Sequence, residues 1–462
     1  MRTGPFVLLG ALLAAAAGLR GAPDPSVLTD AAAIAAAFRT PGHYVIAPGT
    51  YTGNFVVSGS DISVEATGVR FLPRDRYTPA LTVLGSRITI GGLTVANGAP
   101  DRDTVNVGAN TITTIAALPH DVRLERVTAE AGSGGGHRGF GLHGVNITLA
   151  DCRATGFWEV GRDSQAVWIN NGPGPYAIVG GYFEGSGENL MVGGARPGIL
   201  DPAGIPSDIT VRGAHFFKPL AWKTKPGSVK NLFELKAGRR VRVENCVFEN
   251  NWKDAQAGSA ILIKADNQGG TPWMETSDVV FRGNTIRNSP ASYVVNIRGV
   301  NPSNPAVRVR NVTFEYNLFV GVTSGIQSGE GVDGLRVTRN TFLTIGGTFL
   351  GFYGGVQPDG TIFRTPLTFR GNVLHEGAYG VKGDGAAPGT PTLDRYTALE
   401  EFTGNVIERG SRVCAYPAGN TLVAGGTLAA TLDPSTHVYP GPAGYTTAWR
   451  APSRPTGLVI LR

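Results

Sequence analysis

The stretch ITIGGLTV, residues 88–95, introduces a phrase that returns along most of the 462-residue chain. Later copies read ITLADCRA from Ile147, VRVENCVF from Val241 and LTFRGNVL from Leu367. In each copy apolar and polar residues alternate, the pattern breaks at a turn, and the alternation resumes, which is typical of two half-buried strands around a corner. The sixth position of the phrase defines a register, which is occupied by Leu93, Val127, Cys152, Tyr182, Ala214, Cys246, Asn284, Asn317, Asn340, Asn372 and Asn405.

The spacing of these copies indicates a solenoid. It varies from 23 residues (Asn317 to Asn340) to 38 residues (Cys246 to Asn284), the size range of single coils with loops of different length. One such unit cannot enclose a core, but stacked units can. We therefore predict an all-β, single-domain fold, a right-handed parallel β-helix of roughly a dozen coils. With about 4.8 Å between strands, the rod would be about 55–60 Å long.

The ends of the chain predict the domain organisation. Arg2 and the apolar run 6–19 are typical of a secretory signal and too short to cross a bilayer comfortably, so residues 1–22 are expected to be cleaved. The protein would then be secreted (extracellular or periplasmic), without an integral membrane segment. Residues 23–42 contain DAAAIAAAF and are expected to form a short capping helix with Asp30 as N-cap. We expect the β-helix over 43–414 and a C-terminal cap or tail over 415–462.

Charge and cysteine content exclude some functions. The formal charge of +6 falls to +4 without Arg2 and Arg20, and it is not clustered as in proteins that bind nucleic acid. Cys152 and Cys246 lie three coils apart, about 14 Å, which is too far for a disulfide. They are expected to be small buried residues, and Cys414 is left without a role. The one-per-coil asparagines from Asn284 to Asn405 predict a structural ladder.

The strands that follow the phrase contain the candidate chemistry. NLFELK ends at Lys236, AILIK ends at Lys264, and VVNIR ends at Arg298. If the large apolar residues of these strands point inward, alternation places the residues between them on one outer face. That set is Glu234, Lys236, Lys264, Asn296 and Arg298, with Asp266 continuing the middle strand.

Neighbouring cations on one face repel each other unless acids or a bound anion compensate them. One interpretation is a surface salt-bridge network that contributes little to the stability of the protein. The other is a subsite for a carboxylate- or sulfate-bearing sugar, in which cations neutralise the acid and a basic group removes a proton. Trp222, Trp252 and His215, from the irregular segments around this site, are the further candidates for contact with the substrate.

The stretch from Leu232 to Asp266, with LFELK, CVFENN and AILIK, resembles the alginate and chondroitin B lyases of the pectate-lyase-like superfamily. In those right-handed β-helix enzymes a lysine and an arginine on successive coils carry out β-elimination. The resemblance implies that Lys236 corresponds to the lysine and that Lys264 falls near the arginine. In the lyase hypothesis Lys236 is the proton-abstracting base, Lys264 and Arg298 neutralise the uronate, and Glu234 orients Lys236. The resemblance also leaves Ca²⁺ open as a cofactor at Glu234, whereas the residues themselves indicate none. A broader resemblance, strongest at HFFKPLAW, LFELK and FENNW, is to secreted bacterial β-helix repeat proteins.

The leading hypothesis is an exported β-helix protein that binds an acidic polysaccharide and, if it is an enzyme, cleaves it as a polysaccharide lyase by β-elimination. One alternative is a non-catalytic surface or matrix protein that uses the rod for adhesion. Another is a glycoside hydrolase in which Glu234 and Asp254 or Asp266 form a carboxylate pair. Cysteine and histidine spacing indicates no metal site.

Overall fold

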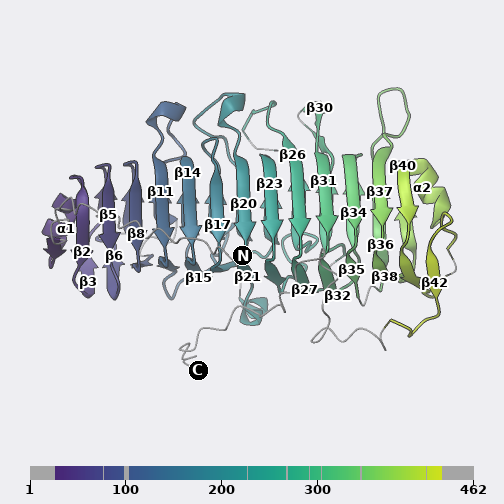
Figure 1. Cartoon of the computed structure of the whole chain (residues 1–462), viewed down its shortest axis with the longest axis horizontal. Coiled ribbons are helices and arrows are strands. Elements are labelled where there is room, and N and C mark those ends of the chain that lie inside the picture. The colour runs from purple at the N-terminus through teal and green to yellow at the C-terminus, as the bar shows by residue number, and fades with distance from the viewer. Residues whose placement is uncertain are drawn as a thin grey trace, which may run out of the picture.

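The computed structural model describes residues 26–428 apart from 76, 98–102, 226, 267–268, 291, 303, 344–345 and 413. The expected signal peptide, residues 1–22, lies outside the described residues, as does the end of the expected tail beyond residue 428. Three long parallel sheets wind around one core, and each strand pairs with the equivalent strand of the coil before and after it. The coil is right-handed, the usual hand for strand–connection–strand units in parallel sheets. Figure 1 shows this single solenoid lengthwise.

Sheet A has 14 strands: β1 (Ser26–Leu28), β2 (Gly42–Ile46), β5 (Ile62–Glu65), β8 (Ile88–Gly91), β11 (His120–Glu125), β14 (Val145–Ala150), β17 (Tyr176–Val179), β20 (Ser207–Arg212), β23 (Gly238–Glu244), β26 (Thr276–Arg282), β31 (Arg310–Glu315), β34 (Asp333–Thr338), β37 (Thr365–Arg370) and β40 (Thr397–Thr403). Sheet B also has 14: β3 (Gly49–Thr52), β6 (Val69–Leu72), β9 (Thr94–Ala96), β12 (Thr128–Glu130), β15 (Arg153–Phe157), β18 (Tyr182–Gly185), β21 (His215–Phe217), β24 (Val247–Glu249), β27 (Thr285–Ser289), β32 (Leu318–Val322), β35 (Thr341–Phe342), β38 (Val373–His375), β41 (Val406–Glu408) and β42 (Thr421–Val423).

Sheet C has 12 strands: β4 (Phe55–Val57), β7 (Leu81–Val83), β10 (Asp103–Val107), β13 (Arg138–Leu142), β16 (Gln165–Ile169), β19 (Glu188–Val192), β22 (Asn231–Leu235), β25 (Ile261–Lys264), β28 (Val295–Arg298), β33 (Ile326–Gly329), β36 (Thr348–Tyr353) and β39 (Gly380–Gly383). A short antiparallel hairpin, β29 (Val300–Asn301) and β30 (Asn304–Arg308), projects from one connection. Three 3-10 turns, Ile115–Ala117, Pro202–Gly204 and Leu220–Thr224 (η1–η3), lie in other connections.

The repeated phrase corresponds to one strand of sheet A, a corner, and one strand of sheet B. In the copy that begins at Ile88, β8 is followed by the corner residue Leu93 and then by β9. Leu93 is 1% exposed, and the sixth position of the phrase faces the interior. The predicted register is wrong for Tyr182, which pairs in register with Arg153, one residue beyond Cys152, and is half-buried on β18; Gly181 occupies the corner of that coil. The inward residues of all three sheets form one continuous apolar core along the rod, and the predicted fold class is confirmed.

The predicted asparagine ladder is present at the corner between sheets A and B. The Nδ2 of Asn284 donates to Asn317 Oδ1 at 2.9 Å, and the same bond links Asn317 to Asn340 at 2.9 Å. It continues through Asn372 and Asn405, and Asn420 extends it by one coil that the phrase does not predict. Because each amide oxygen also accepts a main-chain N–H of the preceding coil, the ladder satisfies buried backbone at the turn.

Both ends of the rod are covered. Helix α1 (Ala31–Ala37) begins at the predicted N-cap, where Asp30 accepts a hydrogen bond from the Ala33 N–H at 2.8 Å. After the helix, Phe38 is fully buried and packs against the rings of Phe55 and Phe71. Helix α2 (Thr390–Tyr396) packs against β39 and β40 at the other end, and β42 continues sheet B beyond residue 414.

The three cysteines are free and buried. Cys152 and Cys246 are 0% and 1% exposed at the corner position, as expected for small filling residues. Neither described α-helix has the length and apolar character needed to cross a bilayer.

Candidate functional site

Long connections flank the outer face of sheet C. Those leading from sheet C to sheet A include residues 108–119, 193–206, 265–275 and 354–364, and Figure 1 shows such loops projecting from one edge of the rod. On the other edge, residues 218–230 and 250–260 lead from sheet B into sheet C. A depression of about 170 Å³ lies between these edges, and it is lined by Asn231, Gln256, Ala257, Ser259, Leu262, Lys264, Asn296 and Arg298.

Strand register brings the predicted basic residues together on this face. Phe233, Ile263 and Ile297 are buried in the core, so the residues between them point outward. Lys264 pairs directly with Arg298 on the next strand. The sequence prediction that these side chains share one face therefore agrees with the geometry.

Glu234 is the centre of the cluster. Its side chain is 1% exposed, and its Oε1 lies 3.5 Å from Lys236 Nζ and 3.3 Å from Lys264 Nζ. The two lysine side chains are 12% and 17% exposed, so both ion pairs are largely shielded from water. A buried carboxylate is costly without compensation, and two ammonium groups provide it here. With Arg298 beside Lys264, three cations face one carboxylate, and the cluster carries excess positive charge.

A second buried acid lies next to this cluster. Glu188 on β19 pairs in register with Asn231, and it accepts a hydrogen bond from Gln165 Nε2 at 2.7 Å. Burial, with the nearby charge of Glu234, raises the pKa of Glu188. Asn231 lines the depression and pairs in register with Glu188, so the buried acid lies one strand away from the depression.

Lys218 anchors the turn that precedes Glu188. It is 0% exposed, and its Nζ donates to the carbonyls of Gly185 (2.5 Å), Ser186 (2.9 Å) and Gly187 (3.1 Å) and to Asn189 Oδ1 (3.0 Å). Burial lowers the pKa of Lys218, and the charge of Glu188 opposes that shift. The lysine holds together the segment that carries Glu188 rather than facing the depression.

The remaining predicted residues are distributed around the site. Asn296 lines the depression and donates to Gln327 Oε1 at 2.8 Å. Asp266 is half-buried two residues beyond Lys264. Trp252 is half-buried in the 250–260 connection, with Lys223 Nζ 5.5 Å from its ring centroid. Trp222 is 6% exposed within η3, so its ring is buried beneath the surface.

His215 lies on a different sheet. It points outward from β21 of sheet B, where its Nε2 is 3.0 Å from Glu249 Oε2. Glu249 also accepts a hydrogen bond from Arg287 at 2.8 Å. The structure therefore does not bring His215 together with the basic cluster on sheet C.

Calcium does not fit the residues around Glu234. Ca²⁺ takes six to eight oxygen ligands, whereas Glu234 faces two lysine ammonium groups. Within the described residues, no group of three or more His, Cys, Asp or Glu side chains is placed to hold a metal ion.

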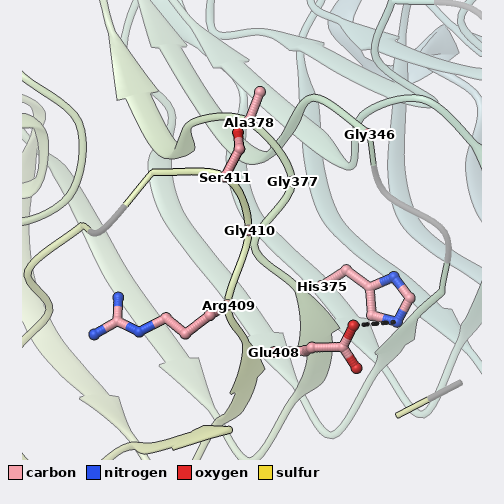
Figure 2. Close-up of a pocket in the computed structure, with 8 residues that line it drawn as sticks. All are labelled: Gly346, His375, Gly377, Ala378, Glu408, Arg409, Gly410 and Ser411. Carbon is pink, nitrogen blue, oxygen red and sulfur yellow. Dashed lines mark ion pairs between the residues drawn. The ribbon is translucent and has the colours of Figure 1, made fainter. Parts of the chain in front are cut away.

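A second depression, of about 270 Å³, lies near the C-terminal end of the solenoid (Figure 2). His375 and Glu408 come from β38 and β41, with 3.8 Å between Nε2 and Oε1. The Glu408 carboxylate already accepts the N–H groups of Gly426 and Leu428. Arg409, on the wall, donates to Glu376 and to the Cys414 carbonyl. Because its charged groups hold the terminal coil, this depression is the weaker candidate.

Three residues near the basic cluster were missed from sequence: Glu188, Lys218 and Tyr353. Glu188 could have been found by counting one strand back from Asn231, since the two pair in register. Lys218 belongs to the irregular segment after β21, where no alternation predicts the direction of a side chain. Tyr353 ends β36, three strands from Lys264, and only the register across the intervening strands relates the two.

Comparison with known proteins gives similar folds at low identity. No family model and no curated protein matches the sequence. A mannuronic acid specific polysaccharide family 6 lyase from human gut microbiota is 14% identical, with 88% of this chain and 92% of that chain covered and a TM-score of 0.46. A surface adhesin of Streptococcus pneumoniae is 13% identical, with 85% and 89% covered and a TM-score of 0.45.

The A-module of a mannuronan C-5 epimerase of Azotobacter vinelandii is 15% identical, with 72% of this chain and 96% of that chain covered and a TM-score of 0.44. These proteins include lyases, an epimerase and an adhesin. We therefore draw no activity from them and rely on the residues of this chain.

Proposed function

We propose that the protein binds an acidic polysaccharide along the outer face of sheet C, with a carboxylate or sulfate group of the sugar seated beside Lys264 and Arg298. The observation that carries this proposal is the sharing of the single carboxylate of Glu234 by Lys236 and Lys264, next to Arg298. The excess positive charge borders a depression, where an anion can approach it. Electrostatic attraction in a partly desolvated site favours an anionic ligand.

The depression also supplies neutral polar groups for the sugar hydroxyls. Asn231, Ser259 and Asn296 line it beside the cations, and Leu262 gives it an apolar patch. A few polar groups around an apolar surface are the usual composition of a small-molecule site. In a salt-bridge network alone, two lysines would share one carboxylate, and Arg298 would have no ion-pair partner among the described residues of this cluster.

Binding is tested with a panel of alginate, pectate, chondroitin sulfate and heparan sulfate, with neutral dextran as the control polymer. We expect at least one acidic polymer to bind, and Arg298→Gln to weaken that binding about tenfold or more. Arg242→Gln is the matched control, because Arg242 is exposed on the outer face of sheet A. Equal binding by wild type and Arg298→Gln, or binding of dextran alone, would refute the proposal.

The same arrangement supports cleavage by β-elimination. Lys264 is charged when it pairs with Glu234, so it would act as the base only after losing its proton; it would then accept the C5 proton of a uronate whose carboxylate is neutralised by Arg298. The C4–O4 bond breaks, a C4=C5 double bond forms, and Lys264 passes the proton it received to the leaving O4, so that no water or oxidant is consumed. Lys264 is preferred to Lys236 as the base because it lines the depression. Glu234 would orient both lysines.

Ultraviolet absorbance of the unsaturated product separates a lyase from a binding protein. We expect the bound polymer to give this absorbance with wild type and not with Lys264→Gln. Binding without an unsaturated product would leave adhesion as the function of the same groove. The carboxylate-pair hydrolase is less well supported, because Glu234 is held by two lysines and Asp254 accepts the Val229 N–H at 2.8 Å.

A further inference from the structure

Two outward positions next to Arg298 are glycines. Gly329 on β33 pairs in register with Arg298, and Gly351 on β36 pairs with Gln327. Their neighbours Ser328 and Leu350 are buried toward the interior, so a side chain at either glycine would project from the outer face of sheet C. Gln327 lies between Asn296 and Gly351 on this face, whereas Gly329 leaves the position in register with Arg298 without a side chain.

Tyrosine rings occupy the space above these glycines. A Cβ at Gly329 would lie 2.0 Å from Cζ of Tyr353, and a Cβ at Gly351 would lie 2.3 Å from the hydroxyl oxygen of Tyr293. Tyr353 pairs in register with Gly329, so its ring leans one strand back toward Arg298. Tyr293 reaches the same face from the connection that precedes β28. Only glycine at both positions leaves room for the two rings.

The two tyrosines are half-buried, and both phenols are uncharged at neutral pH. Burial raises the pKa of Tyr353, and the charge of Arg298 opposes this shift, which places the guanidinium near the phenol. Burial likewise raises the pKa of Tyr293. Each ring thus offers an apolar face; the Tyr353 hydroxyl can donate and accept hydrogen bonds, whereas the Tyr293 hydroxyl already bonds the Thr348 side chain.

We infer that Tyr293 and Tyr353 form a second sugar subsite of the groove, adjoining the basic cluster on its C-terminal side. This subsite rests on the proposed function and deepens it, because it takes the next residue of the same acidic polysaccharide chain. The aromatic surface contacts the apolar face of that sugar ring, and the Tyr353 hydroxyl binds its hydroxyl groups. A chain lying parallel to the solenoid axis meets the cations first and the tyrosines next, since successive strands are about 4.8 Å apart.

The test is the dependence of affinity on chain length. Mannuronate, guluronate and galacturonate, each as the monosaccharide and as the hexamer, are titrated into the full-length protein by calorimetry. For at least one sugar we expect wild type to bind the hexamer at least about tenfold more tightly than the monosaccharide, which fills the cation site alone. Tyr353→Ala should remove most of this advantage and leave the monosaccharide affinity unchanged, which also shows that the variant is folded.

Two further variants test whether the hydroxyl of Tyr353 contributes to binding and whether the position of its ring matters. Tyr353→Phe should keep most of the hexamer advantage, whereas Gly329→Ala should reduce it because the added methyl group displaces the ring. Tyr316→Ala, at the corner between sheets A and B, is the matched control and should behave as wild type.

The outcomes distinguish the two proposals. If wild type binds no oligomer, the proposed function fails and the subsite fails with it. If wild type binds monosaccharide and hexamer equally, or if Tyr353→Ala retains the full hexamer advantage, the subsite is refuted while the anion site at the basic cluster stands.

Discussion

Glu234 and Lys264, on consecutive strands of sheet C, form an ion pair of 3.3 Å in which the carboxylate is 1% exposed. Lys236 lies 3.5 Å from the same oxygen. The pair explains how adjacent coils of the solenoid can carry basic residues on one face without unfolding through repulsion. It also leaves excess positive charge at the depression, on which the proposed binding of an acidic polysaccharide depends.

Removing this carboxylate should destabilise the protein. Glu234→Gln keeps the shape of the side chain but leaves two shielded lysines without their acid, and loss of one partner of a buried ion pair costs about 3 kcal/mol or more. We expect urea unfolding to show a free energy of unfolding lower by about that amount. The matched control is Asp61→Asn, which breaks an exposed pair with Arg87 and should change stability far less, because exposed ion pairs contribute little. Equal effects of the two substitutions would contradict the central position of Glu234.

The asparagine ladder should contribute most in its interior. Asn340 is 1% exposed; its Nδ2 donates to the Phe314 carbonyl, and its Oδ1 accepts the Asn317 N–H, both at 2.9 Å. Asn340→Ala leaves these buried groups unpaired, at about 1–3 kcal/mol each. Asn420→Ala, at the partly buried end of the ladder, should cost less. Chemical denaturation of both variants measures the difference, and a larger loss for Asn420→Ala would argue against a structural ladder.

Acid should remove the contribution of Glu249 to stability. Burial opposes its charge, but the hydrogen bonds from His215 and Arg287 outweigh burial and hold the pKa of Glu249 at about 2, below its ordinary value of 4.5. Because the folded-state pKa is the lower one, the stabilisation is present above pH 4.5 and is lost as the pH falls toward 2. The difference in unfolding free energy between wild type and Glu249→Gln should therefore shrink over this interval. A difference that is constant with pH would show that the charge of Glu249 does not stabilise the fold.

The cysteines should be unreactive in the folded protein. Burial raises the pKa of Cys152 and of Cys246 to about 12, and it raises the pKa of Cys414 as well. Since the thiolate is the reactive form, a thiol reagent at pH 8 should label none of the three quickly under native conditions and all three in denaturant. Rapid labelling of Cys152 without denaturant would mean that the core opens at that coil.

The sequence was most informative where one position has the same role in every coil. Alternation and the corner position predict the parallel β-helix, the buried Cys152 and the ladder from Asn284, because stacking repeats the same local environment. Alternation within a strand also predicts that Lys236 and Lys264 point outward.

Some positions could not be predicted from the sequence, because they depend on how strands align with each other across connections of unequal length. Tyr293 reaches the face of sheet C from such a connection, and its position above Gly351 follows from no pattern within a strand. His215, by contrast, is the seventh residue of the copy ITVRGAHF, so the phrase itself could have placed it on sheet B, where it faces outward. The last strand of the solenoid, β42, could not be predicted either, because it follows a segment in which the phrase is no longer recognisable.

The most direct measurement is the affinity of the full-length protein for a uronate polymer as the salt concentration rises, for wild type and for the double variant Lys264→Gln/Arg298→Gln. We expect wild type to bind at low salt and to weaken progressively as salt screens the charges, and the double variant to bind at least about a hundredfold more weakly. Wild-type binding that is insensitive to salt, or a double variant that binds as tightly as wild type, would show that these cations do not hold the ligand.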